Sequence, residues 1–381
     1  MTNLLFPRTS IFVLLASCSA LCSGAALGKT GDRIPDRYIC VFKAGPISAG
    51  SEARRSVQEV GGSVTHVYSH TINGFAAHLS ATAVTKLRQR NPLVDYCEQD
   101  RVVGLPPTEA GAAAGRPVGG SSQSIGWNIT RVGGPGDGTG KTAWVIDTGL
   151  DFSHPDLVTD QGRSRSFLPN VSSAADANGH GTHVGGIIGA KNNSIGVVGV
   201  AAGATLVSLR VLDATGYGDD SGVIAAVDYL AGQLGTAASA NDVANLSLET
   251  VPLQSLDNAV VALALKGIRV TIAAGNDSSN ASSYSPARAN GINIYTVAAF
   301  GRLAKRDVWA SFSNYGQSPV GPVDYAEPGS SITSTVIGGY GTKSGTSMAA
   351  PHLAGVLLLG SAATNGTVSR TSSDVYPVGS R

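Results

Sequence analysis

Cysteine is absent from most of this 381-residue chain, because none of its four cysteines follows Cys97. The long remainder can form no disulfide bond, so its stability must come from core packing or from bound ions. Cys18 and Cys22 lie near the N-terminus, and Cys40 lies with Cys97 in the segment that follows. The sequence leaves open whether Cys40 and Cys97 are bonded to each other.

Clusters of one charge and long apolar runs are also lacking. The 27 Lys and Arg residues balance 26 Asp and Glu residues, and no run of five basic residues occurs, so we expect no nucleic-acid partner. Beyond the first 26 residues, no stretch approaches the roughly 18 apolar residues of a membrane-spanning helix. Glycine, by contrast, is abundant and scattered, with 49 residues, which indicates a compact fold with many tight turns.

Residues 1–26 have the pattern of an export signal peptide. Arg8 precedes the short apolar run at 11–16, and small residues follow as far as Ala26. Cleavage near Ala25 or Ala26 would release a secreted protein. Alternatively, Leu15-Ala-Ser-Cys18 resembles a bacterial lipobox, in which Cys18 would anchor the pro-form to a membrane through a lipid.

Residues 37–103 have the pattern of a small α+β domain. Their strand-like and helical segments follow the order strand, helix, strand, strand, helix, strand, which is the ferredoxin-like arrangement. Residues 104–122 have the Pro, Gly and Ser content of a linker.

Residues 123–360 alternate apolar strand-like runs with helical segments, whereas residues 361–381 form a polar tail. The alternation predicts an α/β domain with a mostly parallel sheet and helices on both faces. In such sheets, ligands bind beyond the carboxyl ends of the strands, so polar residues at strand ends are candidates for a functional site.

Four polar residues occupy such positions or begin a helix. Asp147 ends the apolar run Ala-Trp-Val-Ile, and Asn276 follows the run Val-Thr-Ile-Ala-Ala-Gly. His180 begins a helix in Asn-Gly-His-Gly-Thr-His, and Ser347 begins one in Ser-Gly-Thr-Ser-Met-Ala-Ala-Pro. Taken singly, each has an ordinary explanation as a turn residue, a helix cap or, for His180 with His183, a metal ligand.

In their order along the chain and in their amino-acid sequences, the four motifs resemble those of the subtilisin-like serine proteases, most closely the proteinase K-like branch. The resemblance implies that His180 takes the proton of the Ser347 hydroxyl, which attacks the substrate carbonyl, while Asp147 orients the imidazole. Asn276 and the Ser347 N–H would hold the oxyanion. Residues 37–103 resemble the inhibitor-type pro-domain of these enzymes, which places a processing site in the linker.

The same resemblance implies a cleft in which two segments pair with an extended substrate, Gly216-Tyr217-Gly218 and Ser247-Leu248-Glu249. Ala273-Ala274-Gly275 would form the opposite wall of the pocket for P1, the residue before the cleaved bond. The family usually has glycine at the position of Glu249. A carboxylate there predicts tolerance of Lys or Arg at P1, and a glutamate turned to solvent is the alternative.

Structural calcium is a further implication of the resemblance. One site would use oxygen atoms, several of them backbone carbonyls, which suit Ca²⁺; its residues are Gln123, Asp156, Lys191, Asn193, Ile195 and Val197. The ammonium group of Lys191 argues mildly against it. A second site would involve Asp324, and loops without an ion are the alternative for both.

We therefore expect a secreted, monomeric serine endopeptidase, made as an autoprocessed zymogen, that acts on polypeptides and is inhibited by its own pro-domain. A non-catalytic peptide-binding module is the first alternative, and the complete set of four site residues argues against it. An esterase is the second. The pro-domain and the two strand-pairing edges favour peptides over small esters.

Overall fold

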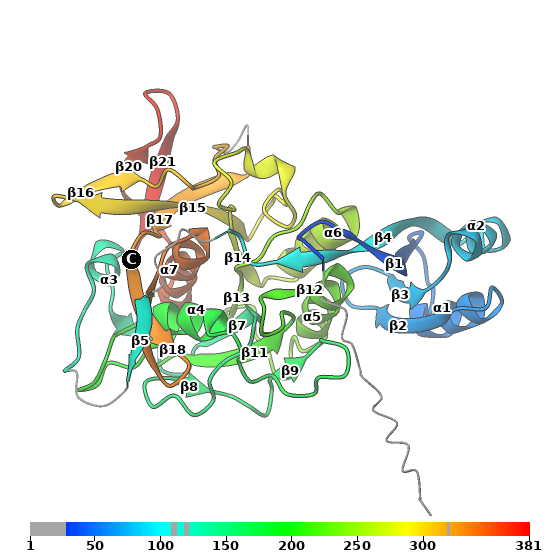
Figure 1. The fold of residues 1–381 in the computed structure, drawn as a ribbon, viewed down its shortest axis with the longest axis horizontal. Coiled ribbons are helices and arrows are strands. Elements are labelled where there is room, and N and C mark those ends of the chain that lie inside the picture. The colour runs from blue at the N-terminus through cyan, green and yellow to red at the C-terminus, as the bar shows by residue number, and fades with distance from the viewer. Residues whose placement is uncertain (1–27, 108–112, 118–121, 318–320) are drawn as a thin grey trace, which may run out of the picture.

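The computed structural model describes residues 28–107, 113–117, 122–317 and 321–381. The expected signal peptide, with Cys18, lies outside the described residues, as do 108–112 and 118–121 of the expected linker. The chain forms a small N-terminal domain, blue to cyan in Figure 1, beside a much larger second domain. No helix within the described ranges is long and apolar enough to cross a membrane.

The small domain is an antiparallel sheet with strand order β4-β1-β3-β2, and it has the ferredoxin-like arrangement that the sequence predicts. On one face, Phe42 and Phe75 of the sheet pack with Ala53, Val57 and Leu87 of two helices. The elements are β1 (Arg33–Phe42), α1 (Ala49–Gln58), β2 (Ser63–Tyr68), β3 (Gly74–His78), α2 (Ala81–Arg90) and β4 (Val94–Gly104).

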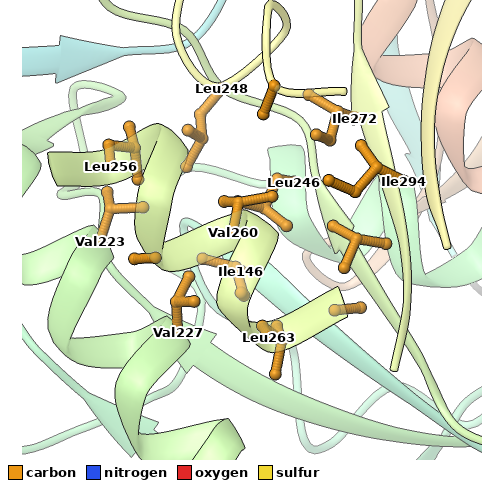
Figure 2. Packing of buried hydrophobic residues seen from close by; sticks show 14 of the residues in the cluster. Ile146, Val223, Val227, Leu246, Leu248, Leu256, Val260, Leu263, Ile272 and Ile294 are labelled. Atoms are coloured by element: carbon orange, nitrogen blue, oxygen red, sulfur yellow. The ribbon is translucent and has the colours of Figure 1, made fainter. Parts of the chain in front are cut away.

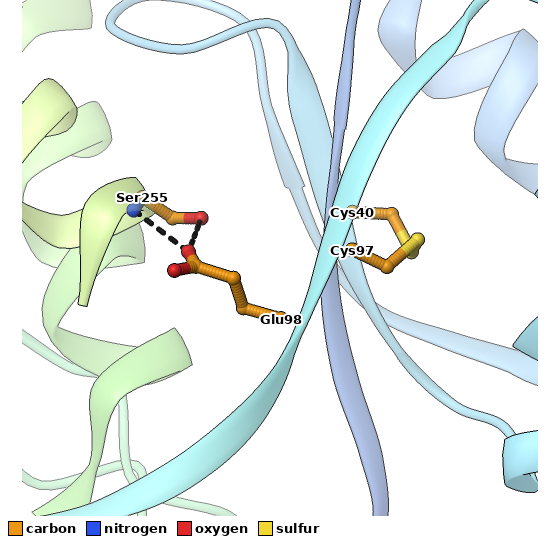
Figure 3. The surroundings of a disulfide bond; sticks show 4 residues. All are labelled: Cys40, Cys97, Glu98 and Ser255. Carbon is orange, nitrogen blue, oxygen red and sulfur yellow. Dashed lines mark hydrogen bonds between the residues drawn. A yellow bond between two sulfur atoms is a disulfide. The ribbon is translucent and has the colours of Figure 1, made fainter.

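A disulfide bond joins Cys40 of β1 to Cys97 of β4, which are direct cross-strand partners (Figure 3). This answers the question that the sequence leaves open. The other face of the sheet, with Ile39 and Tyr68, is buried in the same hydrophobic cluster as the core of the large domain. The small domain therefore uses its neighbour as part of its core.

The large domain is built on a nine-stranded sheet with the main order β16-β15-β14-β13-β7-β11-β8, in which only β16 is antiparallel to its neighbour. It is thus the mostly parallel sheet that the sequence predicts. Its strands are β7 (Thr142–Asp147), β8 (Val158–Thr159), β9 (Arg165–Ser166), β11 (Thr205–Arg210), β13 (Val243–Leu246), β14 (Arg269–Ala273), β15 (Ile294–Leu303), β16 (Arg306–Trp309) and β17 (Val323–Pro328).

Helices cover both faces of this sheet. On one face, Ile146 and Leu246 pack with Val223 of α5 and Val260 of α6 (Figure 2). A second buried cluster places α4 and α7 on the other face. The helices are α3 (Trp127–Arg131), α4 (His180–Gly189), α5 (Asp220–Gly232), α6 (Gln254–Leu265), α7 (Thr346–Leu359) and the short η1 (Ala281–Ser283).

Short strands complete the domain, and the last two form a hairpin where the sequence suggests a polar tail. Tyr376 and Val378 are buried in the main cluster, and the last strand lies against β17. The remaining strands are β5 (Ala113–Pro117), β6 (Gly136–Asp137), β10 (Ala201–Ala202), β12 (Tyr217–Asp219), β18 (Ile332–Val336), β19 (Gly339–Lys343), β20 (Ala363–Ser369) and β21 (Val375–Ser380).

Candidate active site

The carboxylate of Asp147 and the imidazole of His180 form a buried pair at the carboxyl edge of the sheet. Asp147 is the last residue of β7, and His180 is the first residue of α4. His180 Nδ1 lies 2.9 Å from Asp147 Oδ1 and 3.0 Å from Oδ2, and the two residues are 1% and 0% exposed. A proton on Nδ1 is held by this carboxylate, so Nε2 is left to accept a proton.

A glycine allows α4 to approach the strand this closely. A Cβ atom at Gly181 would lie 2.2 Å from the Gly149 carbonyl oxygen and 3.1 Å from Asp147 Oδ1. Any side chain there would push His180 away from its carboxylate partner.

Asp176, which the sequence analysis missed, fixes the start of α4. Its carboxylate accepts hydrogen bonds from Gly179 N (2.9 Å), Thr182 N (3.0 Å) and Thr182 Oγ1 (2.6 Å), and also from Thr148 Oγ1 next to Asp147. An acidic residue shortly before a predicted helix is a capping signal that could have revealed it.

Ser347 is the second residue of α7, and this helix directs its N-terminus, with its partial positive charge, toward the site. Ser347 Oγ and His180 Nε2 are both buried, and within the described parts of the chain neither has a hydrogen-bond partner. The hydroxyl and the free imidazole nitrogen are thus both available for proton transfer.

Asn276 presents its amide nitrogen to a peptide carbonyl. Its Oδ1 accepts hydrogen bonds from Thr346 N and Thr346 Oγ1, both at 2.8 Å, which fixes the orientation of the amide. Its Nδ2 donates to the carbonyl oxygen of Pro107 at 2.7 Å. Pro107, at the start of the linker, was not among the predicted site residues.

The tail of the small domain lies between the two predicted cleft edges. Its strand β4 pairs with β12, with Gly104 opposite Tyr217 (Figure 1). Gly104 and Glu249 exchange two backbone hydrogen bonds of 3.0 and 2.9 Å, and Leu105 N donates to Gly216 O at 3.1 Å. Both edges therefore bind an extended segment of the chain itself, in the manner expected for a substrate.

The predicted P1 pocket contains the side chain of Glu249. This residue is 3% exposed, and its Oε2 has no hydrogen-bond partner among the residues described. A Cβ atom at Gly275 would lie 2.7 Å from this oxygen, so the carboxyl group touches the opposite wall. Burial, helped by the nearby Asp277 carboxylate, raises the pKa of Glu249 to about 8. The alternative prediction, in which the Glu249 side chain turns to solvent, therefore does not agree with this buried conformation.

Other predicted cleft residues are buried behind these two edges or bonded to the backbone of the site. Ser247 Oγ donates to the Ser347 carbonyl oxygen at 3.1 Å. Leu248, Ala273 and Ala274 are fully buried.

Three further histidines have structural partners and do not join the site. His183 Nε2 lies 3.0 Å from Ile332 O, and His154 Nε2 lies 2.9 Å from Gly339 O. His352 lies between Met348 O and Asn128 Nδ2. Burial lowers the pKa of His183 to about 3 and that of His352 to about 4, so both rings stay neutral.

The residues predicted for the first calcium site lie together. Asn193 Nδ2 and Val197 N donate to the two carboxylate oxygens of Asp156, at 2.8 and 3.2 Å, and Gln123 Nε2 donates to Lys191 O at 3.1 Å. Rotating the two side-chain amides by half a turn would present their oxygens instead. The described residues contain no cluster of three His, Cys, Asp or Glu that could hold a metal, so neutral oxygens would have to supply most ligands.

Two further predicted metal-site residues have partners within the protein. The Lys191 ammonium donates to Pro155 O at 2.7 Å. Asp324, predicted for the second calcium site, accepts a hydrogen bond of 2.9 Å from Thr296 N.

Comparisons with known proteins agree with this architecture. The profile of the Subtilase family matches residues 138–373, and that of Peptidase inhibitor I9 matches residues 37–106. Alkaline serine exoprotease A of Vibrio alginolyticus is 40% identical over 348 residues, which cover 86% of this chain and 60% of that protein. The chain thus spans less than two thirds of this relative's length.

For other relatives, the alignment covers a larger share of the relative's own length. Proteinase R of Parengyodontium album is 36% identical, with 86% of this chain and 79% of that protein covered. Subtilisin E of Bacillus subtilis is also 36% identical, with 94% and 87% covered.

Solved structures show the same fold. A cold-adapted subtilisin-like serine proteinase is 42% identical, with a TM-score of 0.50 over 58% of this chain and 76% of that one. Fervidolysin from Fervidobacterium pennivorans has a TM-score of 0.68 at 23% identity, over 87% of this chain and 55% of that one, and supports the fold alone.

Fold, site geometry and comparisons together define a serine protease preceded by an inhibitory pro-domain. The chain belongs to the subtilase family. The expected class of enzyme and the type of pro-domain are thereby confirmed, and the non-catalytic alternative is not favoured.

Proposed function

We propose that this protein is a secreted serine endopeptidase in which Ser347 is the nucleophile, His180 the general base and Asp147 the group that orients and stabilises the imidazole. The observation that carries the proposal is the Asn276 amide, which donates to the carbonyl oxygen of Pro107 in a cleft that also holds the buried Asp147–His180 pair. This hydrogen bond supports the proposal because the same amide would donate to the oxyanion.

In the proposed reaction, Ser347 Oγ bonds to the carbonyl carbon while its proton passes to His180 Nε2. The carbonyl oxygen gains the negative charge, and Asn276 Nδ2 with the Ser347 N–H stabilises it. The C–N bond then breaks, and the leaving amine takes the proton from His180. Water repeats the sequence on the acyl-enzyme and releases the acid. One oxyanion donor of this kind is typically worth roughly 10²–10³ in kcat.

Residues 37–103 are proposed as the inhibitory pro-domain, 104–122 as the linker and 123–360 as the catalytic domain. The support is that Gly104, Leu105 and Pro107 occupy the cleft in the place of a substrate. We place the processing cut after Pro107 and before Gln123, because Gln123 belongs to the proposed calcium site. Intact-mass measurement of the mature protein tests this placement, and a mature chain that begins after Gln123 would contradict it.

Secretion is proposed from the signal-like pattern of residues 1–26, and one relative is named an exoprotease. The alternative, lipidation of Cys18, would attach the lipid to the pro-domain and leave the processed protease free. Fractionation of cells that make the Ser347→Ala protein separates the two. Pro-form in the soluble fraction supports signal cleavage near Ala26, and pro-form in membranes supports the lipid.

Calcium is proposed at the site of Asp156, where one carboxylate, two side-chain amide oxygens and the carbonyls of Lys191, Ile195 and Val197 form an oxygen set that fits Ca²⁺. The ion would stabilise the catalytic domain by binding the folded state only. Chelator should lower the melting temperature of the wild type and have a much smaller effect on Asp156→Asn. The same response in both proteins would remove this assignment. The second site, at Asp324, is proposed on the family resemblance alone.

The function is tested by assaying casein beside a small ester with wild type, Ser347→Ala and His180→Ala. The proposal expects hydrolysis of casein by the wild type and loss of both activities in both variants. Ester hydrolysis without casein hydrolysis would instead support the esterase. Size-exclusion chromatography tests the expected monomer in the same preparation.

A further inference from the structure

The P1 pocket contains a buried acid, Glu249, in which one carboxyl oxygen has no hydrogen-bond partner among the described residues. The Glu249 side chain comes from one wall, and its Oε2 reaches the backbone of Gly275 on the other wall. This oxygen is shielded from water and accepts no hydrogen bond from any described residue. Buried carboxyl oxygens in proteins nearly always have a hydrogen-bond partner, so an unpartnered one in a binding pocket points to a polar or charged group of a ligand.

Within the described residues, the surroundings of Glu249 add negative charge and supply no cation. Asp277, on the exposed loop after β14, and the hydroxyl of Tyr284 are the titratable groups that face it. The prolines at the end of the pro-domain tail, Pro106 and Pro107, are apolar and bring no charge into the cleft. The pocket therefore has an acidic group on each of two sides, and the pro-domain tail supplies no cation to pair with either of them.

We propose that Glu249 determines the specificity of the first pocket and that the mature enzyme selects a Lys or Arg side chain at P1, whose cation forms an ion pair with the Glu249 carboxylate. Asp277 adds a second, more exposed negative charge at the same pocket. This inference rests on the proposed peptidase function and names the substrate class for its site. A hydrogen bond to a charged partner is worth roughly ten- to hundredfold in binding.

The pH dependence of this preference has a defined sign. With the tail bound, the raised pKa of Glu249 keeps its carboxyl group neutral below about pH 8. A P1 cation favours the ionised form, so its binding releases a proton and becomes stronger as pH rises. Departure of the tail admits water, which lowers this pKa, so the preference should level off at or below pH 8.

A second explanation of Glu249 is volume alone, because the five heavy atoms that glutamate has beyond glycine would narrow the pocket and favour small P1 residues. Glu249→Gln separates charge from volume, since glutamine has nearly the same size and no charge. Glu249→Gly removes both. Each variant is matured as the full-length protein, and its active fraction is measured with a serine-directed phosphonate.

The experiment compares kcat/KM for peptides that differ only at P1, with Lys, Met, Ala or Glu. The expected wild-type preference for Lys over Met falls about tenfold or more in Glu249→Gln. In the wild type alone, it increases from pH 6 and levels off by about pH 8. An unchanged Lys/Met ratio in Glu249→Gln, or a wild-type preference for Ala over Lys at every pH, would overturn the proposal.

If both variants fail to mature, the wild-type ratio is measured at low and high salt and across the same pH range. A ratio that responds to neither would also overturn the proposal. If the wild type were neither labelled by the phosphonate nor able to hydrolyse any of the peptides, the proposed peptidase function itself would be contradicted.

Discussion

The two domains of this protein are stabilised in different ways. The catalytic domain has no cysteine and relies on two large hydrophobic clusters, one on each face of a nine-stranded sheet. The pro-domain has one small cluster of its own, a disulfide between β1 and β4, and a second sheet face that is buried only against the catalytic domain. The catalytic domain thus has a hydrophobic cluster on each face of its sheet, whereas the pro-domain buries one face of its sheet only against its neighbour.

Polar contacts at the interface, by contrast, are reciprocal, because each domain accepts hydrogen bonds from backbone of the other. Glu98 of the pro-domain accepts hydrogen bonds from Gln254 N and Ser255 N at the start of α6, at 3.0 and 2.9 Å. Figure 3 shows the bond from Ser255. In return, Asp228 of α5 accepts hydrogen bonds from the backbone of the pro-domain residues 69–71. These donors would lose their partners when the domains separate.

The largest effect expected is that of Ser347→Ala. Activity should fall at least a thousandfold, because the acyl-enzyme can no longer form. The pro-domain should then remain covalently attached, and gel electrophoresis of the secreted protein would show it. Normal maturation of this variant in a host without other proteases would contradict self-processing.

Removal of the disulfide should show most clearly that the two domains differ in how they are stabilised, because it should destabilise the pro-domain alone. In the chain-entropy account, a cross-link that encloses 57 residues is worth about 4 kcal/mol. Cys40→Ser with Cys97→Ser, in the stable Ser347→Ala background, should therefore speed hydrogen exchange of β1 amides and leave β14 amides unchanged. Equal acceleration in both strands would show that the domains unfold as one unit.

A smaller effect is expected for Glu98→Gln, which keeps the side-chain length and removes the charge at the N-terminus of α6. We expect a loss of about 1 kcal/mol in pro-domain stability. Urea titration of the Ser347→Ala chain, followed through trypsin cleavage of the pro-domain, measures it. Asp95→Asn is the matched control, since Asp95 is an exposed acid on the same strand, and its midpoint should not move.

An effect of similar size concerns the dependence of pro-domain stability on pH. Burial, and then the nearby Asp219 carboxylate, raises the pKa of Asp100 to about 6, although Arg37 pairs with both acids. A raised carboxyl pKa stabilises the bound state fully below about pH 4, and this contribution is lost as pH rises through about 6. His66 acts in the opposite direction, because burial lowers its pKa.

The test of this pH effect is therefore a comparison with Asp100→Asn. Between pH 4 and pH 6, pro-domain stability of the Ser347→Ala chain should decline relative to that of its Asp100→Asn derivative, by up to about tenfold in the unfolding equilibrium constant. Parallel pH curves for the two proteins would show that Asp100 contributes nothing to the dependence.

The sequence predicted the features that local patterns determine. Both sheets and the helices on both faces follow from the alternation of apolar runs and helical segments, and the sequence motifs around the four predicted site residues identified the family. Asp176, the Pro107 contact and the burial of Glu249 were missed or left open because they depend on which distant segments meet. The C-terminal hairpin was missed because β20 is mostly exposed, and only a few residues of β21 show apolar alternation.

The most direct test of the account is peptide mapping by mass spectrometry after the secreted protein reacts with a serine-directed phosphonate. The account predicts a single adduct, on Ser347, in the processed wild type. It predicts little adduct in His180→Ala, whose serine lacks a base, and in the unprocessed form, whose cleft is filled by the tail. An adduct on another serine, or a processed protein that hydrolyses casein without labelling Ser347, would contradict the assignment of the active site.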